Sequence, residues 1–162
     1  MAISEEEFKR CMSAWPSGVT VVTSCAGDTI HGMTVSDFSG ASLTPPLAVV
    51  LCDRASLTTR MISEGGCFGV SILSVEQQEI SDRFASKKLE HVRFEGIEYE
   101  IGQTGAPLLT GALANLDCRL TATHEVGDHL IFVGLIESAE VRPGAPLVYW
   151  GAGYRKLEDE AD

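Results

Sequence analysis

The sequence predicts a mainly β fold, in which antiparallel strands close, or nearly close, into a barrel with a few helices at its periphery. Short runs of β-branched and apolar residues recur along the chain, and turn signals such as Gly-Asp separate several of them. Helical patterns are few and short. This combination is typical of barrels and sandwiches and not of alternating strands and helices around a parallel sheet.

Length and charge limit the possible architectures and partners. The chain has 162 residues, and we expect residues 1–162 to form a single domain with a substantial core. Acidic residues outnumber basic ones, 23 to 12, which gives a formal net charge of -11. Because nucleic acids and anionic membranes bind basic surfaces, neither is expected as a partner. The sequence shows no signal peptide and no apolar run of transmembrane length.

The cysteines indicate a reducing environment. Their number is odd and no Cys-x-x-Cys motif occurs, so we expect reduced, mostly buried thiols and a cytoplasmic location. The five residues are Cys11, Cys25, Cys52, Cys67 and Cys118.

Three short helices are expected. The first covers about residues 4–14, where Ser4 and Glu7 form a capping-box pattern and Pro16 ends the element. The second begins at the N-cap Ser56 and stops at two glycines. The third begins at a capping box and ends at about Phe84.

Strands are expected where β-branched or alternating apolar residues form a run. These runs are residues 18–25, 30–35, 47–53, 68–73, 116–123, 129–141 and 147–150. Residues 86–115 are polar and rich in glycine, so we expect an excursion with little regular structure. The run from Leu130 to Ile136 is apolar on both faces, and a homodimer contact would cover the outer one.

The stretch from His31 to Pro46 is the first candidate for a binding site. It is rich in small and hydroxyl residues, lies between two apolar runs, and contains neither an acid–base pair nor a set of metal ligands. Its backbone N–H groups and hydroxyls suit a planar ligand with polar edges, or a phosphate. A serine-rich connection between two strands would have the same composition.

Two further segments combine an arginine with a helix end. Residues 53–58, Asp-Arg-Ala-Ser-Leu-Thr, provide an arginine and a helix N-terminus that together suit a phosphate. Residues 82–85, Asp-Arg-Phe-Ala, place a second arginine beside an aromatic ring. An ordinary capped helix and a solvated helix end are the respective alternatives.

The histidines around the turn that precedes the expected strand at residues 129–141 form another candidate binding site. Gly127-Asp128-His129 is a turn whose imidazole would face a ligand or, alternatively, solvent. The spacing of His124, Glu125 and His129 is one residue too long for the helical zinc motif, so no metal is expected. The dinucleotide-binding Gly-x-Gly-x-x-Gly motif after a strand and the Walker A motif are both absent from the sequence.

Several motifs follow one another along residues 8–157. They are Trp15-Pro-Ser-Gly-Val-Thr-Val-Val-Thr23, Gly32-Met-Thr-Val-Ser36 with Phe38-Ser39 and Ser42-Leu43 before Pro45-Pro46, Asp53-Arg54 with Ser56 and Thr58, Asp82-Arg83-Phe84-Ala85, Gly111-Ala-Leu-Ala114, Gly127-Asp128-His129 and Pro146-Leu-Val-Tyr149. This ordered set resembles the short-chain flavin reductase family, the reductase components of two-component flavin-dependent monooxygenases.

The resemblance implies a six-stranded antiparallel split β-barrel with Greek-key connections, which binds FMN or FAD and forms a homodimer. NADH or NADPH would provide a hydride for the flavin, and reduced flavin would leave for a partner oxygenase. These properties are expectations from the family and not deductions from composition.

The resemblance also implies roles for individual residues. Thr34, Val35 and Ser36 would border the isoalloxazine ring, while His129 would lie on the nicotinamide side, with Tyr154 as a weaker candidate there. The other residues implied in cofactor binding, most of them along the ribityl and phosphate path, are Asp37, Ser42, Leu43, Asp53, Arg54, Ser56, Thr58, Arg83 and Phe84.

Three positions depart from the family pattern. Asp37 stands where serine is common, and a carboxylate beside a flavin would disfavour the anionic reduced form. Ser71 stands where asparagine is usual, and residues 151–153 lack an arginine often found there. The flavin and nucleotide preferences therefore stay open.

Two other functions are compatible with such a barrel. One is a non-catalytic flavin- or haem-binding protein, in which His129 would be incidental. The other is an oxidase of the pyridoxine-phosphate type, but its substrate phosphate would require several basic residues, and the acidic composition disfavours it.

Overall fold

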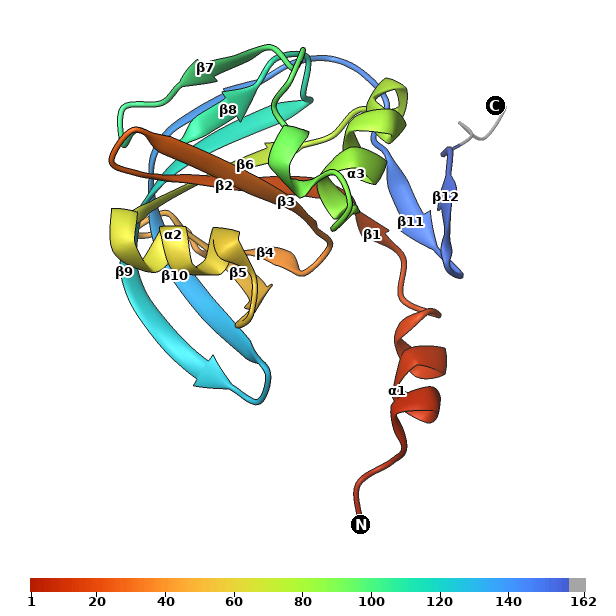
Figure 1. Ribbon diagram of the computed structural model, residues 1–162. Coiled ribbons are helices and arrows are strands. Elements are labelled where there is room, and N and C mark those ends of the chain that lie inside the picture. Colours follow the sequence, from red (N-terminus) through yellow and green to blue (C-terminus); the bar gives the residue numbers. More distant parts are fainter. Residues whose placement is uncertain (158–162) are drawn as a thin grey trace.

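The computed structural model describes residues 1–157, so residues 158–162 of the expected domain lie outside the described part (Figure 1). Its helices are α1 (Glu5–Met12), α2 (Leu57–Gly65) and α3 (Gln78–Ala85), with short 3-10 turns η1 (Val75–Gln77) and η2 (Glu90–Val92). Its strands are β1 (Ser17–Gly18), β2 (Thr20–Ala26), β3 (Thr29–Val35), β4 (Phe38–Ser42), β5 (Leu47–Asp53), β6 (Cys67–Ile72), β7 (Tyr99–Ile101), β8 (Pro107–Leu109), β9 (Ala114–Val126), β10 (His129–Val141), β11 (Val148–Trp150) and β12 (Gly153–Arg155).

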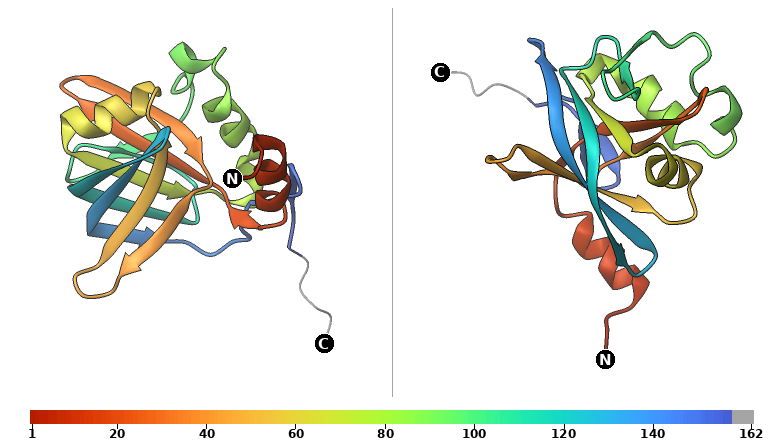
Figure 2. Two further views of the ribbon diagram at one scale, coloured as in Figure 1. Left: turned by 90° about the horizontal axis from the view of Figure 1, so that it is seen from below. Right: turned by 90° about the vertical axis from the view of Figure 1, so that its left-hand side faces the viewer.

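The main sheet has the strand order β3-β2-β6-β9-β10-β5-β4, and its pairs are antiparallel. Val35 on β3 and Val50 on β5 belong to one buried cluster, although four strands separate β3 from β5 in this order. The sheet therefore curls around a common core, as the two views in Figure 2 show. The mainly β, barrel-like fold is confirmed.

The sheet contains seven strands in the described residues, whereas the expected barrel has six. The additional strand is β4, which pairs with β5 from Phe38 opposite Val50 to Ser42 opposite Leu47. Sequence analysis placed this segment inside a serine-rich stretch, where no hydrophobic alternation marks a strand. β4 is mostly exposed and acquires its extended form from pairing with β5.

The long hairpin of β9 and β10 lies between β6 and β5 in the main sheet. Gly127 makes its turn with φ 56°, a left-handed conformation that glycine adopts easily. Farther along, the register shifts between Val133 and Gly134. A Cβ atom at Gly134 would lie only 2.6 Å from Phe68 Cε1, so the absence of a side chain there lets the Phe68 ring fill the core.

The expected excursion is more ordered than the sequence suggests. Residues 86–115 contain η2 and a small sheet of β7 and β8. The buried Asp117 carboxylate on β9 accepts hydrogen bonds from the Thr104 backbone N–H, at 3.0 Å, and from the Thr104 hydroxyl. Ser71 Oγ accepts a hydrogen bond from the Leu109 backbone N–H at 3.0 Å, and Asn115 Nδ2 donates to the Leu109 carbonyl at 3.0 Å. These buried polar contacts attach the excursion to the barrel.

Helix α1 stands apart from the barrel (Figure 1). The capping box of Ser4 and Glu7 is present, as expected, but no residue of α1 is buried. The side chain of Phe8 is 56% exposed and that of Trp15, just after the helix, is 71% exposed. The apolar side of α1 therefore lacks the partner surface against which an amphipathic helix normally packs.

No helix in residues 1–157 is both long and apolar enough to cross a membrane.

Candidate functional site

The turn between β3 and β4 is the centre of the candidate site. The Phe38 backbone N–H donates to the Ser36 carbonyl and the Leu51 N–H donates to the Asp37 carbonyl, each at 3.0 Å. These bonds fix the backbone of the turn and leave the Asp37 side chain exposed. No ion pair involves Asp37 within residues 1–157.

Two neighbouring cavities meet at this turn, and Ser36, Tyr149 and Ala152 line both. The larger, about 560 Å³, lies between α1, the β4–β5 hairpin and β11. Its wall is rich in aromatic rings, and Asp37 is the only carboxylate among its lining residues. Together the cavities form a groove of the size and apolar character that suit a large planar ligand.

The smaller cavity, about 490 Å³, has a polar wall. The Tyr154 hydroxyl donates to Asp82 Oδ1 at 3.0 Å and lies 2.8 Å from Ser81 Oγ. Thr34 Oγ1 donates to the Ser81 carbonyl at 2.6 Å. Burial raises the pKa of Tyr154, so its phenol stays protonated and acts as a fixed hydrogen-bonding group.

The N-terminus of α2 has the form expected for an anion site, but several of its groups are engaged. Ser56 Oγ accepts from the Thr59 N–H at 3.0 Å, and Asp53 Oδ1 accepts from the Ala55 N–H at 2.8 Å. Thr58 is fully buried, and its hydroxyl lies 2.7 Å from His31 Nδ1. The structure thus places Thr58 behind the helix end, in contact with His31.

A buried polar cluster beside α2 was not predicted from the sequence. The Arg93 guanidinium, 5% exposed, donates from Nη1 to the Gly32 carbonyl at 2.8 Å. His31 Nε2 is buried, lacks a hydrogen-bond partner and lies 3.6 Å from Glu90 Oε1. Burial and then the Arg93 charge lower the pKa of His31, which keeps the imidazole neutral. No periodic signal in the irregular excursion marks Arg93.

His129 begins β10, directly opposite Asp53 on β5. Its Nδ1 lies 2.7 Å from Asp128 Oδ1, and its side chain is 39% exposed. The hydrogen bond and charge of His129 lower the pKa of Asp128. The ring is therefore oriented by a neighbouring carboxylate while one face stays accessible, near the α2 N-terminus and outside both cavities at Ser36.

The arginines expected near a phosphate are partly occupied by other groups. Arg54 Nη2 pairs with Glu125 Oε2 at 3.0 Å across the hairpin. Arg83 Nη1 donates to the Glu95 carbonyl at 2.6 Å. Both contacts are at the surface, where a competing anion can displace them at small cost.

Of the expected residues, only Thr34, Ser36, Asp37 and Tyr154 line the groove. Several others lie in the core or at a distant end of a strand. Phe84 is fully buried in a core cluster, with its ring edge-on to Phe94 at 5.1 Å, and offers no surface to a ligand. Ser42 and Leu43 lie at the opposite end of β5 from Asp53, so one chain does not bring them to Ser56 and Thr58. The remaining expected residue, Val35, points into the barrel core.

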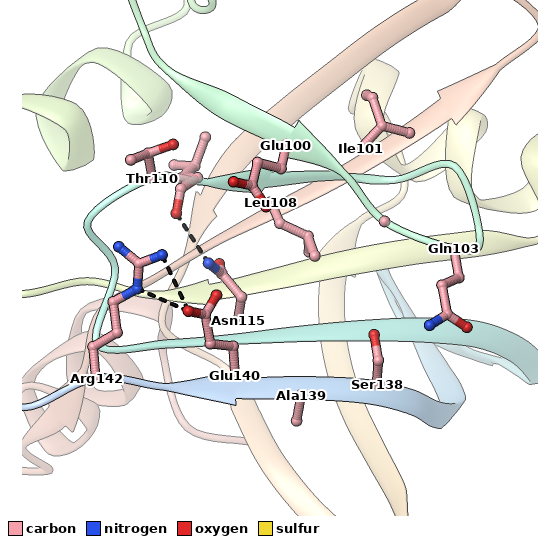
Figure 3. Close-up of a pocket in the computed structure, with 12 residues that line it drawn as sticks. Glu100, Ile101, Gln103, Leu108, Thr110, Asn115, Ser138, Ala139, Glu140 and Arg142 are labelled. Atoms are coloured by element: carbon pink, nitrogen blue, oxygen red, sulfur yellow. Dashed lines mark hydrogen bonds and ion pairs between the residues drawn. The ribbon is translucent and has the colours of Figure 1, made fainter.

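A further cavity, about 320 Å³, lies beneath the excursion (Figure 3). Arg142 and Glu140, paired at 3.1 Å, lie on one side, and Asn115 donates to the Leu109 carbonyl at 3.0 Å on another. No residue expected to bind a ligand lines this cavity. Of its polar side chains, Arg142 and Glu140 pair with each other and Asn115 is held by the backbone, so these groups are already engaged.

Comparisons with known proteins all indicate the same family. A family model described as "Flavin reductase like domain" matches residues 12–158. The NADH-dependent flavin reductase of a Rhodococcus species is 38% identical and is matched over 93% of this chain and 85% of its own length. The reductase component of 4-hydroxyphenylacetate 3-monooxygenase from Thermus thermophilus is 41% identical, over 94% and 97%.

Solved structures give the same result. The flavin reductase component of a bacterial two-component tryptophan halogenase superposes with a TM-score of 0.89 at 35% identity, covering 97% of this chain and 100% of that one. The NADH:FAD oxidoreductase of Streptomyces globisporus, in complex with NAD and FAD fragments, gives 0.90 at 29% identity, covering 100% and 99%.

Proposed function

The chain belongs to the flavin reductase-like family, and on this premise we propose that it is an NAD(P)H:flavin oxidoreductase. It reduces FMN or FAD with NADH or NADPH and supplies the reduced flavin to a partner monooxygenase. The observation that carries the proposal is the large groove at Ser36, which combines aromatic rings with the backbone and hydroxyl groups of the turn. A bound flavin accepts a hydride from the nicotinamide, and neither cofactor needs a protein acid or base for this step.

The residues present fit a flavin. The turn at Ser36 presents backbone and hydroxyl groups to the polar edge of a ring, and Phe38 and Trp150 provide apolar surface nearby. Tyr154, held by Asp82 and Ser81, forms the opposite wall. The N-terminus of α2 with Ser56 and Arg54 would receive the phosphate. His129 would orient the nicotinamide.

The nucleotide preference follows from the end of the chain. A 2′-phosphate requires a positive partner. No basic residue lies within residues 149–154, which favours NADH. Arg155 lies over the Trp150 ring at 5.9 Å and donates from Nη1 to the Tyr154 carbonyl at 2.8 Å, but it and Lys156 are exposed, so NADPH stays the alternative.

The cysteines support the cytoplasm as the location of a single-domain protein. All five are free thiols, and three of them are buried. This arrangement is ordinary for a protein that folds under reducing conditions.

A homodimer accounts for the uncovered apolar surface. Phe8 on α1 and Trp15 just after it are exposed, and Leu43, in the turn between β4 and β5, is 90% exposed. A second copy would cover these side chains and the outer face of β10. It would also add residues beside the groove, because α1 itself lines the larger cavity.

The first prediction concerns the reaction. Anaerobic stopped-flow mixing of the protein and FMN, or FAD, with NADH should bleach the oxidised-flavin absorbance, and the rate should saturate as free flavin is added. Saturation would show that flavin is a substrate and which flavin is preferred. Tight flavin binding without bleaching by NADH or NADPH would instead establish the non-catalytic alternative.

The second prediction concerns His129. In His129→Ala the rate of bleaching should fall roughly tenfold or more, because a misplaced nicotinamide loses reactive geometry, while the Kd for oxidised flavin stays unchanged. His124→Ala is the matched control, since His124 is an exposed histidine on the same hairpin. Equal rates for the two variants would show that His129 is an ordinary turn residue with no role in hydride transfer.

The third prediction concerns Asp37, whose carboxylate is unpaired in the groove. Its charge should weaken binding of anionic reduced flavin, so Asp37→Asn should lower the Kd for reduced flavin by roughly tenfold and change the Kd for oxidised flavin much less. Anaerobic fluorescence titrations measure both constants. Asp28→Asn, an exposed aspartate in the β2–β3 turn, should change neither. A uniform change of both constants in Asp37→Asn would contradict this electrostatic role.

The fourth prediction concerns assembly. Sedimentation equilibrium should give a dimer at micromolar concentration, and Phe8→Ser together with Trp15→Ser should shift it towards monomer by removing buried apolar area. A wild-type protein that stays monomeric over the whole concentration range would contradict the homodimer.

A further inference from the structure

Cys25 and Cys67 lie next to each other on adjacent strands. In the antiparallel ladder of β2 and β6, Thr23 lies opposite Gly69. Continuing this register by two residues places Cys25 opposite Cys67, and their Sγ atoms are 3.8 Å apart. Opposite residues in antiparallel strands have Cα atoms about 4.5–5.5 Å apart, within the span of about 4.4–6.8 Å that a disulfide bridges.

The surroundings hold the two strands together at this point. Ser24 Oγ donates to the Cys67 carbonyl at 2.7 Å, just beyond the last ladder pair. Cys67 is 1% exposed, whereas Cys25 is partly exposed. Gly105 lies close to Cys25, since a Cβ atom there would be 3.0 Å from Cys25 Sγ. Cys25 is thus the more exposed residue of the pair and Cys67 the buried one.

We propose that Cys25 and Cys67 are a modification site, a cross-strand dithiol that hydrogen peroxide converts to a disulfide. The Cys25 thiolate attacks the peroxide O–O bond and forms a sulfenic acid, and hydroxide leaves and takes up the thiol proton as water. Cys67 sulfur then attacks Cys25 sulfur, the S–O bond breaks, and a second water leaves with the Cys67 proton. Two thiols lose two electrons in total, and one peroxide is reduced to two waters.

The proposed function supplies the oxidant. Free reduced flavin reacts with oxygen to give oxidised flavin and hydrogen peroxide, so a reductase that outpaces its oxygenase partner produces peroxide beside itself. Only this source of peroxide rests on the proposed function. The geometry of the thiol pair stands without it, and an experiment with added peroxide tests the pair separately.

The thiols react slowly at neutral pH. Burial, and then the neighbouring Cys67, raise the pKa of Cys25 to about 11, and the Asp117 carboxylate acts in the same direction. Because the thiolate is the reactive form, the rate should rise by about tenfold per pH unit below this pKa. The pair would therefore respond to sustained exposure to peroxide and not to a brief pulse.

The disulfide would act on stability more than on the groove. It would tie β2 to β6 at the end of β2 that lies opposite Ile30, whereas Val35 pairs with the other end, at Thr20. A covalent link between strands restricts the unfolded chain and should raise the Tm by several degrees. The Kd for flavin should stay unchanged.

The test uses the full chain with Cys11→Ser, which removes the exposed cysteine that would form intermolecular disulfides. The reduced protein is incubated with hydrogen peroxide at pH 7.5 and pH 8.5, and free thiols are then blocked. The expected product is a Cys25–Cys67 linked peptide by mass spectrometry, reversed by dithiothreitol, with initial formation about tenfold faster at pH 8.5. The Tm of the oxidised protein should rise accordingly.

Cys25→Ser in the same background is the control, because Cys25 is partly exposed and serine is nearly isosteric. This variant should give no linked peptide and no peroxide-dependent change in Tm. Accumulation of sulfinic or sulfonic acid on Cys25 with Cys67 still reduced would overturn the proposal. So would a pair of thiols that stays reduced at pH 8.5 under peroxide conditions that oxidise the exposed Cys11 of the unsubstituted chain.

Discussion

The structure depends on one packing constraint: β3 and β5 must both bury side chains in the same core although four strands lie between them. The sheet meets this requirement by curling. The absence of a side chain at Gly134 leaves space for the Phe68 ring inside the curled sheet. Because β3 and β5 approach each other, the turn at Ser36 comes close to the strand that leads into α2. The packing of the core thus positions the groove, and groove residues such as Val19 and Phe38 also pack in or against the core.

A site built in this way is fixed by main-chain and side-chain hydrogen bonds. The turn at Ser36 is fixed by main-chain hydrogen bonds, and Tyr154 is fixed by Asp82 and Ser81. Such a site can orient planar molecules but has no group placed to take up or release a proton during the reaction. This limitation fits chemistry in which the two cofactors exchange a hydride and the protein controls only distance and angle.

Sequence analysis predicted the elements that have strong periodicity, such as the long strands β9 and β10, and the capped helix α1. It missed β4, because that strand depends on pairing and not on its own residues. It also placed Phe84 at the cofactor, since a motif does not show which of its members faces the core. Arg93 gave no signal, because its role depends on a carbonyl 61 residues away, that of Gly32. Local patterns predict local structure, and these errors all concern contacts made at long range.

The distribution of charge connects the site with its proposed role. Arg54 is paired with Glu125 and Arg83 with a carbonyl, while Arg93 is buried. The chain carries a net charge of -11, and Asp37 adds an unpaired carboxylate to the groove. A phosphate would have to compete with these partners for the arginines, and a reduced, anionic ring would be repelled. An enzyme that must release its product to another protein gains from both effects, because reduction itself then weakens binding of the product.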